Sequence, residues 1–232
     1  MNRETTNKIR FILEDILPPI IRDSFIFKLI IRKMFKNKTL ERLKSDILKI
    51  SRKEYANLYK NLNRIHKDSD LSQICINEIL KNIKPNQVLD VGCGEGFLLN
   101  EIKNKYKNIS LTGIEMEASF KLKNKLKNKG IRLIEKKIEN LDKIKNKYDT
   151  VICTHVLEHI LDINLAYENL KKICKKRLII VVPRERAYQH TFNPHLHFFP
   201  YKWSFINTIR PKNKFIIKDL NRDLLYVENL NL

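Results

Sequence analysis

Three glycines follow a short apolar run in the stretch "VLDVGCGEGFLL", residues 88–99, although the 232-residue chain has only five glycines. A strand, a glycine-rich turn and a helix in this order form the general nucleotide-binding unit of α/β proteins, because small residues let a ligand approach backbone amides. This stretch constrains the fold more than any other feature. It predicts a strand inside a parallel sheet, with the turn at the carboxyl end of that strand.

Strand and helix patterns alternate on both sides of this turn. Helices are predicted at 70–83, 97–106, 118–130 and 157–174, and strands at the run ending at residue 90 and at 109–115, 131–138, 148–156 and 177–183. Such alternation indicates parallel strands joined by crossover helices. A helix near 201–209 precedes two strand patterns, 214–220 and 224–230, which are too close for a crossover and should pair antiparallel. We therefore predict an α/β, Rossmann-like three-layer sandwich with a seven-stranded, mostly parallel sheet whose last strand is antiparallel.

The first 70 residues are predicted to form a helical extension or lid (1–70) before the main domain (71–232). The prolines of "LPP", residues 17–19, should end one helix. Residues 20–38 then form an amphipathic pattern with basic residues beside its apolar face. This helix either packs on its own domain or makes a peripheral contact with an anionic membrane. A further helix at 52–66 carries Tyr55 and Tyr59 one turn apart, which we interpret as packing residues.

The net charge of +20 favours an anionic partner such as nucleic acid or a membrane surface. Lysine, isoleucine and asparagine, however, dominate the whole chain, and the basic excess forms no tail. The four cysteines are scattered without a CxxC pair, which predicts reduced thiols. We expect neither a signal peptide nor a transmembrane helix. The predicted localisation is cytoplasmic, with peripheral contact at the inner face of the membrane as the alternative.

The spacing of the turn residues narrows the choice of ligand. Gly92, Gly94 and Gly96 form a GxGxG pattern, which differs from the GxGxxG of dinucleotide-binding enzymes. Asp90 stands two residues before the first glycine, and the next strand ends in Glu115, 19 residues after Gly96. A carboxylate at that place can accept hydrogen bonds from both hydroxyls of a ribose.

With these residues in view, the sequence resembles the class I S-adenosylmethionine-dependent methyltransferases, in particular the group that methylates small molecules. Four blocks within residues 52–232 carry the resemblance: "VLDVGCGEG", "LTGIEM", "IRLIEKKIENL" and "YDTVICTHVLEHI". The resemblance implies S-adenosylmethionine as cofactor. It assigns the methionine end to Asp90, Gly92 and Gly94, the ribose to Glu115, and the adenine to Met116. Cys93, Gly96, Ile138 and Thr154 are further cofactor-binding candidates.

One block departs from the family pattern. Many relatives carry an aspartate after the third strand that binds the adenine amino group, but Lys137 stands there in this chain. A lysine cannot accept that hydrogen bond. Adenine recognition therefore falls either to the backbone around Ile138 or to Glu139.

Histidines are the candidate catalysts, because an oxygen or nitrogen acceptor that carries a proton has to lose it and imidazole titrates near neutral pH. His155 and His159 lie at the end of the fourth predicted strand. His190, His195 and His197 lie in "PRERAYQHTFNPHLHFFPYKW", which resembles a family segment that closes over the substrate. The candidates are His155, His190 and His195, while orientation of the next helix is the alternative for His159. A metal site is not predicted, since the histidine spacing lacks a supporting acid.

Three functions compete for this chain. The first is methyl transfer to a small molecule or glycan, because "FILEDILPPIIRDS" faintly resembles methyltransferases of bacterial surface-polysaccharide genes; a lipid-linked sugar is one such acceptor. The second is RNA or DNA methylation, favoured by charge, but "THVLEH" replaces the Pro-Pro-aromatic motif that grips a base. The third is a membrane-surface or scaffold protein that retains the fold without activity, against which the intact Asp90, glycine turn and Glu115 argue. The sequence predicts no oligomeric state.

Overall fold

The computed structural model describes residues 3–35, 49–51, 54, 69–84, 86–187 and 194–230. The chain divides into two compact units. The first consists of Met1–Lys67 and Glu185–Phe198, and the second of Asp68–Arg184 and Phe199–Leu232. The domain boundary that we place at residue 70 stays a prediction. Tyr55 and Tyr59 lie outside the described residues.

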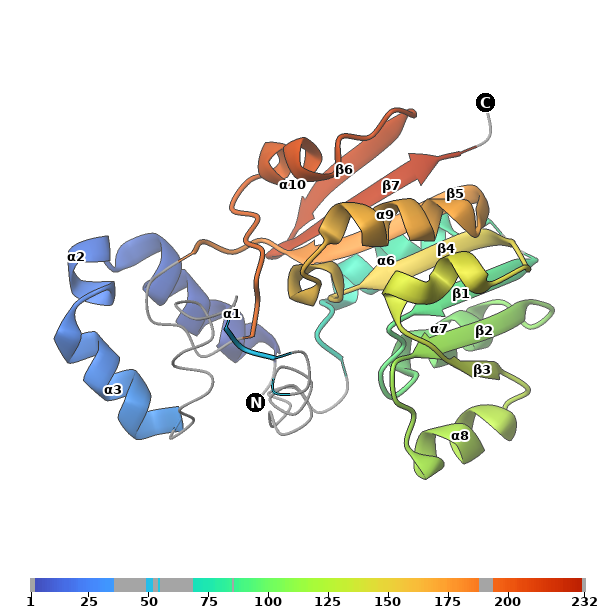
Figure 1. Ribbon diagram of the computed structural model, residues 1–232, viewed down its shortest axis with the longest axis horizontal. Helices are drawn as coiled ribbons and strands as arrows, with labels where there is room; N and C mark the ends of the chain where they lie inside the picture. The colour runs from blue at the N-terminus through green and yellow to red at the C-terminus, as the bar shows by residue number, and fades with distance from the viewer. Residues whose placement is uncertain are drawn as a thin grey trace. The chain divides into compact units, whose positions relative to one another are not determined.

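The second unit contains a seven-stranded sheet with the order β3-β2-β1-β4-β5-β7-β6 (Figure 1). Its strands are β1 (Gln87–Val91), β2 (Ser110–Glu115), β3 (Arg132–Glu135), β4 (Tyr148–Thr154), β5 (Cys174–Pro183), β6 (Phe215–Leu220) and β7 (Asp223–Asn229). The pairs from β3 to β5 are parallel, whereas β7 runs antiparallel to both β5 and β6. The predicted mostly parallel sheet with an antiparallel last strand is confirmed.

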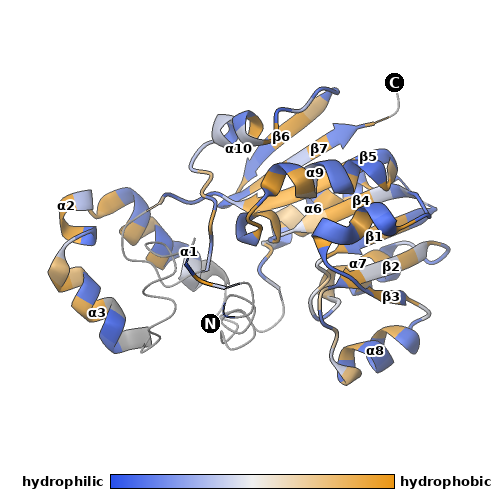
Figure 2. Cartoon of the chain, in the orientation of Figure 1, coloured by the Kyte–Doolittle hydropathy of each residue, from blue (hydrophilic) through white to orange (hydrophobic). Residues whose placement is uncertain are grey.

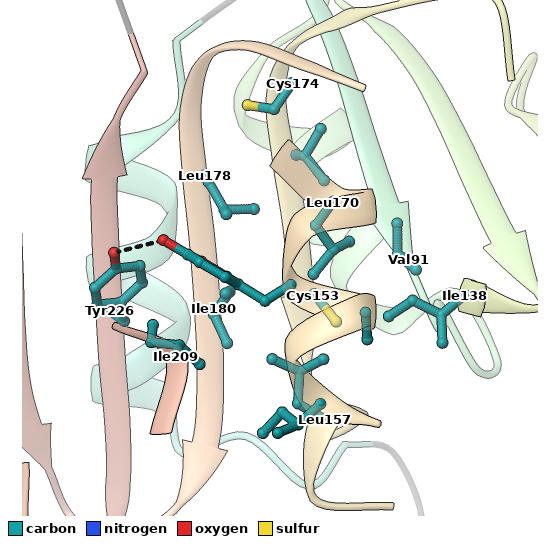
Figure 3. Packing of buried hydrophobic residues seen from close by; sticks show 14 of the residues in the cluster. Val91, Ile138, Cys153, Leu157, Leu170, Cys174, Leu178, Ile180, Ile209 and Tyr226 are labelled. Carbon is teal, nitrogen blue, oxygen red and sulfur yellow. Dashed lines mark hydrogen bonds between the residues drawn. The ribbon is translucent and has the colours of Figure 1, made fainter. Parts of the chain in front are cut away.

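Helices cover both faces of this sheet because the inner strands alternate apolar side chains between the two faces. On β5, Ile180 packs in one apolar cluster with α9 (Ile163–Lys172) and α10 (Lys202–Ile209). Its neighbour Ile179 packs in the other cluster with α6 (Gln73–Asn82), α7 (Phe97–Lys105) and α8 (Phe120–Lys127). Figure 3 shows the first cluster between α9 and the sheet. The predicted three-layer sandwich is confirmed.

Two local predictions differ from the structure. The helix predicted from residue 157 begins at Ile163, because Leu157–His159 forms a separate 3-10 turn, η3. Asp162 caps α9 by accepting a hydrogen bond from Leu165 N at 2.9 Å. The strand predicted at 131–138 ends at Glu135, and a 3-10 segment, η2 (Ile138–Lys143), follows it.

A tight hairpin sets the start of β7. Asn221 and Arg222 both have positive φ, 50° and 72°, and they join Leu220 to its antiparallel partner Asp223. Two consecutive left-handed residues are typical of a two-residue hairpin turn. Because β7 runs antiparallel to β5, its first residue lies beside Pro183, at the edge where the parallel strands end. The hairpin therefore brings Asp223 to the edge that carries the glycine turn.

The described part of the first unit begins with helices. α1 (Arg3–Phe11) continues into one π-helical turn, η1 (Ile12–Ile16), and the helix ends before Pro18, as predicted. The single helix predicted over residues 20–38 is instead divided into α2 (Pro19–Arg22) and α3 (Phe25–Phe35). Ser24 Oγ accepts a hydrogen bond from Phe27 N at 3.2 Å, which caps α3 and explains the break. None of the described helices is long and apolar enough to cross a membrane.

The four cysteines, Cys75, Cys93, Cys153 and Cys174, are buried free thiols, as predicted.

Candidate functional site

The glycine-rich turn joins β1 to α7 at the carboxyl edge of the sheet. Gly92 N and Cys93 N donate to Ile114 O at 2.8 and 3.0 Å, which fastens the turn to the end of β2. Gly92 has φ +75°, and a Cβ at this position would overlap Val156 Cγ2. Glycine is therefore required both by the left-handed backbone and by the close approach of the segment after β4.

Two carboxylates flank this turn. Glu115 is half-buried and accepts hydrogen bonds from Gly94 N at 2.7 Å and from Met116 N at 3.0 Å. Each of its oxygens has a second lone pair for another donor. Asp90 is 1% exposed, and its Oδ1 makes no hydrogen bond to any described residue. Burial, followed by the charge of Glu115, raises the pKa of Asp90 to about 7.

A buried carboxylate oxygen without a donor indicates a place for a ligand that donates hydrogen bonds or carries positive charge. The structure thus brings Asp90, the glycine turn and Glu115 together, as the sequence pattern requires. Cys93 lies buried inside the turn, and burial raises the pKa of its thiol, so that it stays neutral. Gly96 is the N-cap residue that precedes α7, and Thr154 ends β4 at the same edge of the sheet.

The loop after β3 is held in place by a side chain of α9, a helix that covers one face of the sheet. Ile138 is 5% exposed, whereas Lys137 and Glu139 are exposed. Asn169 of α9 donates its Nδ2 to Ile138 O at 3.3 Å and to Glu139 O at 3.0 Å. The side chain of Asn169 therefore fixes the backbone of the loop for which we predict adenine contacts. Sequence reasoning did not single out Asn169, since an asparagine inside a helix carries no spacing signal.

His155 directly follows β4 in a left-handed conformation, with φ 53°. Its Nε2 lies 3.2 Å from Asp223 Oδ1 and its Nδ1 lies 3.4 Å from Glu158 Oε1. Asp223 and Glu158 are both fully buried. Burial lowers the pKa of His155, but the two carboxylates outweigh it and raise the pKa to about 10. His155 is therefore a cation at neutral pH.

The pair of Asp223 and His155 extends to α6. Ser72 caps this helix by accepting a hydrogen bond from Cys75 N at 3.3 Å. Ser72 also donates its N and its Oγ to Asp223 Oδ2, at 3.2 and 3.1 Å. One buried network thus connects the start of α6, the end of β4, η3 and the start of β7. Asp223 was missed by sequence reasoning, because it is 68 residues from His155 and only the hairpin brings the two together.

Comparison with known proteins agrees with this geometry. The model of a family described as "Methyltransferase domain" matches residues 84–204, which include the glycine turn, Glu115 and His155. This chain belongs to that methyltransferase family. It is a class I S-adenosylmethionine-dependent methyltransferase domain.

The methyltransferase is similar to several proteins of this kind. It is 31% identical over 124 residues to ubiquinone biosynthesis O-methyltransferase of Rickettsia prowazekii, a match that covers 48% of each chain. It is 29% identical over 118 residues to (S)-tetrahydroprotoberberine N-methyltransferase of Eschscholzia californica, covering 47% of this chain and 33% of that one. The match thus spans about half the length of the curated Rickettsia relatives.

The solved structure of PigF with SAH has the same fold, with a TM-score of 0.58 at 16% identity over 90% of this chain and 71% of that one.

The residues present at the glycine turn fit S-adenosylmethionine. The unpartnered Oδ1 of Asp90 suits the ammonium group of the methionine end, and Glu115 retains lone pairs for ribose hydroxyls. Because Val156 approaches Gly92 so closely, the turn has no room for a side chain at residue 92. The individual cofactor assignments made from the sequence stay predictions.

His195, the second histidine candidate, lies in the first unit. Its Nδ1 pairs with Glu185 Oε1, and Glu185 Oε2 lies 3.3 Å from Arg10 Nη2. Arg10 Nε also pairs with Glu14 Oε1 at 2.9 Å. These four side chains are between 3 and 17% exposed, so they form a largely buried ionic network. A carboxylate behind a histidine ring fixes its orientation, as in bases that activate a nucleophile.

Sequence reasoning named His195 but missed the acids and the arginine around it. The only signal was the acid of "PRER" immediately after β5, which we did not connect with a helix near the N-terminus. His190, the third candidate, lies outside the described residues.

Proposed function

We propose that this protein transfers a methyl group from S-adenosylmethionine to an oxygen or nitrogen atom of a small molecule or glycan, with a lipid-linked or surface-polysaccharide intermediate as the favoured acceptor. The observation that supports it best is the buried Asp90 Oδ1, which has no hydrogen-bond donor among the described residues and lies at the same glycine turn as Glu115. The names of the curated relatives include both an O- and an N-methyltransferase, which supports either acceptor atom.

In this proposal the cofactor supplies an activated methyl group on its sulfonium. The protein orients the two reactants and excludes water from the site. Asp90 binds the ammonium of the methionine end, while Gly94 N and Glu115 set the place of the ribose. Ile138 and Met116 contribute the walls of the adenine pocket. Asn169 fixes the backbone carbonyl groups of Ile138 and Glu139. The adenine amino group can therefore be recognised by backbone, without a contribution from the exposed Lys137.

The histidines take different roles. His155 is already protonated between two carboxylates, so it suits positioning of the segment beside Gly92 and does not suit removal of a proton. His195, with Glu185 behind its ring, is the proposed general base. A base is needed only where the acceptor carries its proton into the reaction.

The cofactor assignment is tested with Asp90→Asn, which keeps the shape and removes the charge. A hydrogen bond to a charged group contributes about 1.5–3 kcal/mol, so the dissociation constant for S-adenosylmethionine should rise about tenfold to a hundredfold at pH 8. Isothermal titration calorimetry measures it. Asp142→Asn, the same change at an exposed position outside the turn, is the control.

Stability separates a binding defect from a folding defect in this variant. The folded-state pKa of Asp90 is raised from 3.8 to about 7, so its ionisation destabilises the unliganded protein as the pH rises through this range. Asp90→Asn removes this destabilising ionisation. The variant should therefore be at least as stable as the wild type at pH 8, as measured by urea denaturation. Unchanged cofactor affinity in this folded variant would overturn the cofactor assignment.

The acceptor class is tested in cells with and without the gene. Mass spectrometry of lipid-linked sugars, surface glycans and small metabolites should reveal a product heavier by one CH₂ group, restored by the wild-type gene but not by an Asp90→Asn copy. A methylated nucleic acid as the sole product would contradict the proposal.

A further inference from the structure

The surface formed by α2 and α3 is unusually apolar. Six large hydrophobic side chains on these two helices are exposed: Ile20 (84%), Ile21 (50%), Phe25 (70%), Ile26 (71%), Leu29 (45%) and Ile30 (50%). We call these six residues the α2–α3 apolar surface. Figure 2 shows the apolar residues along both helices. Contiguous exposed apolar side chains in a folded protein usually mark a surface that binds something else.

The α3 part of this surface has helical order. Phe25, Ile26, Leu29 and Ile30 recur at one-turn spacing, so they lie on one face of the helix. Lys33 continues the same face one turn after Leu29 and Ile30, and it is exposed. The exposed apolar stripe therefore ends in a basic residue, as in helices that lie at a lipid–water boundary.

Charge around the surface identifies the occupant. Between Pro19 and Phe35 the chain carries four basic residues, Arg22, Lys28, Arg32 and Lys33, against the single acid Asp23. Arg22 is buried and donates a hydrogen bond to Leu13 O, so the surface charge comes from the other three. Three of the four basic residues lie on α3. Long basic side chains can extend from an apolar face to phosphate groups while their methylene stems stay in the apolar layer. Such a surface fits anionic lipid headgroups above an apolar layer.

The length of the helix determines how it can lie. α3 has 11 residues, which at about 1.5 Å per residue is far shorter than the roughly 30 Å of a bilayer core. The break at Ser24 also ends the short α2 before it can extend α3. The helix pair can therefore rest in the plane of a membrane surface but cannot span it.

We propose that the α2–α3 apolar surface binds the interface of an anionic lipid bilayer. Ile20, Phe25 and Ile26, the three most exposed side chains, enter the acyl region, and Lys33 and Arg32 contact the phosphates. This binding needs neither cofactor nor acceptor, so it goes beyond the methyl-transfer function and is tested independently of it.

The experiment is vesicle flotation of the whole 232-residue chain with phosphatidylcholine vesicles and with vesicles containing phosphatidylglycerol. The wild type should float with the anionic vesicles, bind neutral ones more weakly, and lose binding at high salt. Ile26→Glu should weaken binding about tenfold or more, because it places a charge in the acyl region that the isoleucine side chain enters in the wild type. Lys33→Glu should weaken binding to anionic vesicles and leave neutral ones little changed.

Ile74→Glu is the matched control, since Ile74 is 59% exposed on α6 and lies outside the α2–α3 apolar surface. It should bind vesicles as the wild type does. Circular dichroism and S-adenosylmethionine affinity, unchanged in all three variants, verify that each is folded. The proposal is overturned if the wild type fails to float, if Ile26→Glu floats normally, or if the wild type is a dimer that Ile26→Glu dissociates, because the surface would then bind a second copy.

Discussion

At the scale of single residues, Gly92 lets the glycine turn and the segment after β4 pack closely, because it has no side chain. It lies at φ +75°, and Val156 Cγ2 occupies the space that a Cβ at residue 92 would need. Gly92→Ala should therefore destabilise the fold by more than the roughly 1–2 kcal/mol that a left-handed alanine costs. The double variant Gly92→Ala/Val156→Ala removes the overlap but keeps the backbone cost. Urea denaturation should show that the double variant loses less stability than the sum of the two single variants. Simple additivity would mean that Val156 does not close this position.

His155 provides the second residue-scale prediction. Its folded-state pKa, about 10, is above the ordinary 6.5, so its contribution to stability is complete below pH 6.5 and is lost as the pH rises through about 10. His155→Gln leaves Asp223 and Glu158 buried without a cation between them. It should lose about 3 kcal/mol or more at pH 7, and the difference from the wild type should shrink toward pH 10.

NMR of the histidine ring provides a direct check on that prediction. The His155 resonances, assigned by their loss in His155→Gln, should remain those of the protonated ring at pH 8. His197→Gln, a histidine change outside the cluster, is the control. A ring that titrates below pH 7 would contradict the positioning role and return His155 to the candidate bases.

At the scale of elements, a buried polar contact fastens the antiparallel strand β7 to α9. Tyr167 of α9 donates its hydroxyl to Glu228 Oε2 at 2.7 Å, and Asn213 donates to Oε1 at 2.8 Å. Glu228 is fully buried. Tyr226 meets Tyr167 only at 3.4 Å between hydroxyls, the contact drawn as a dashed line in Figure 3. The carboxylate therefore depends on Tyr167 more than on Tyr226.

Tyr167→Phe should accordingly destabilise the protein by about 1–3 kcal/mol, because it leaves one oxygen of a buried carboxylate with fewer donors. Tyr226→Phe is the matched control and should lose less, since both changes remove one hydroxyl and keep the ring. Thermal and urea unfolding measure the two losses. A larger loss in Tyr226→Phe would show that the Tyr226 hydroxyl is the main partner.

Sequence patterns identified most elements because inner strands such as β4 and β5 contain continuous apolar runs and each helix shows its own periodicity. Periodicity failed where a local side-chain contact decides the boundary. The cap at Ser24 divides the predicted helix of residues 20–38, and the cap at Asp162 delays α9. At the site, the glycine turn and Glu115 are close in sequence and were found. Asp223 and Glu185 were not, because their contacts with His155 and His195 arise only from tertiary folding.

At the scale of the whole molecule, net charge opposes the compact state. The chain carries 46 basic and 26 acidic residues, a net charge of +20. Its exposed ion pairs, such as Lys123 with Glu135 at 2.7 Å, are screened by water and contribute little to stability. Salt weakens both these pairs and the general repulsion, but the repulsion acts between many more charges.

The midpoint of thermal unfolding should therefore rise with salt. Between about 20 mM and about 500 mM NaCl the Debye length falls to a few ångströms, which screens the repulsion. A gain of about 1 kcal/mol corresponds to roughly 2–4 °C in a chain of this size. The variant Lys107→Glu/Lys145→Glu changes two exposed lysines and removes four units of net charge. It should unfold at a higher temperature than the wild type in low salt and respond less to added NaCl. A midpoint that falls with salt in the wild type would mean that the surface ion pairs outweigh the repulsion.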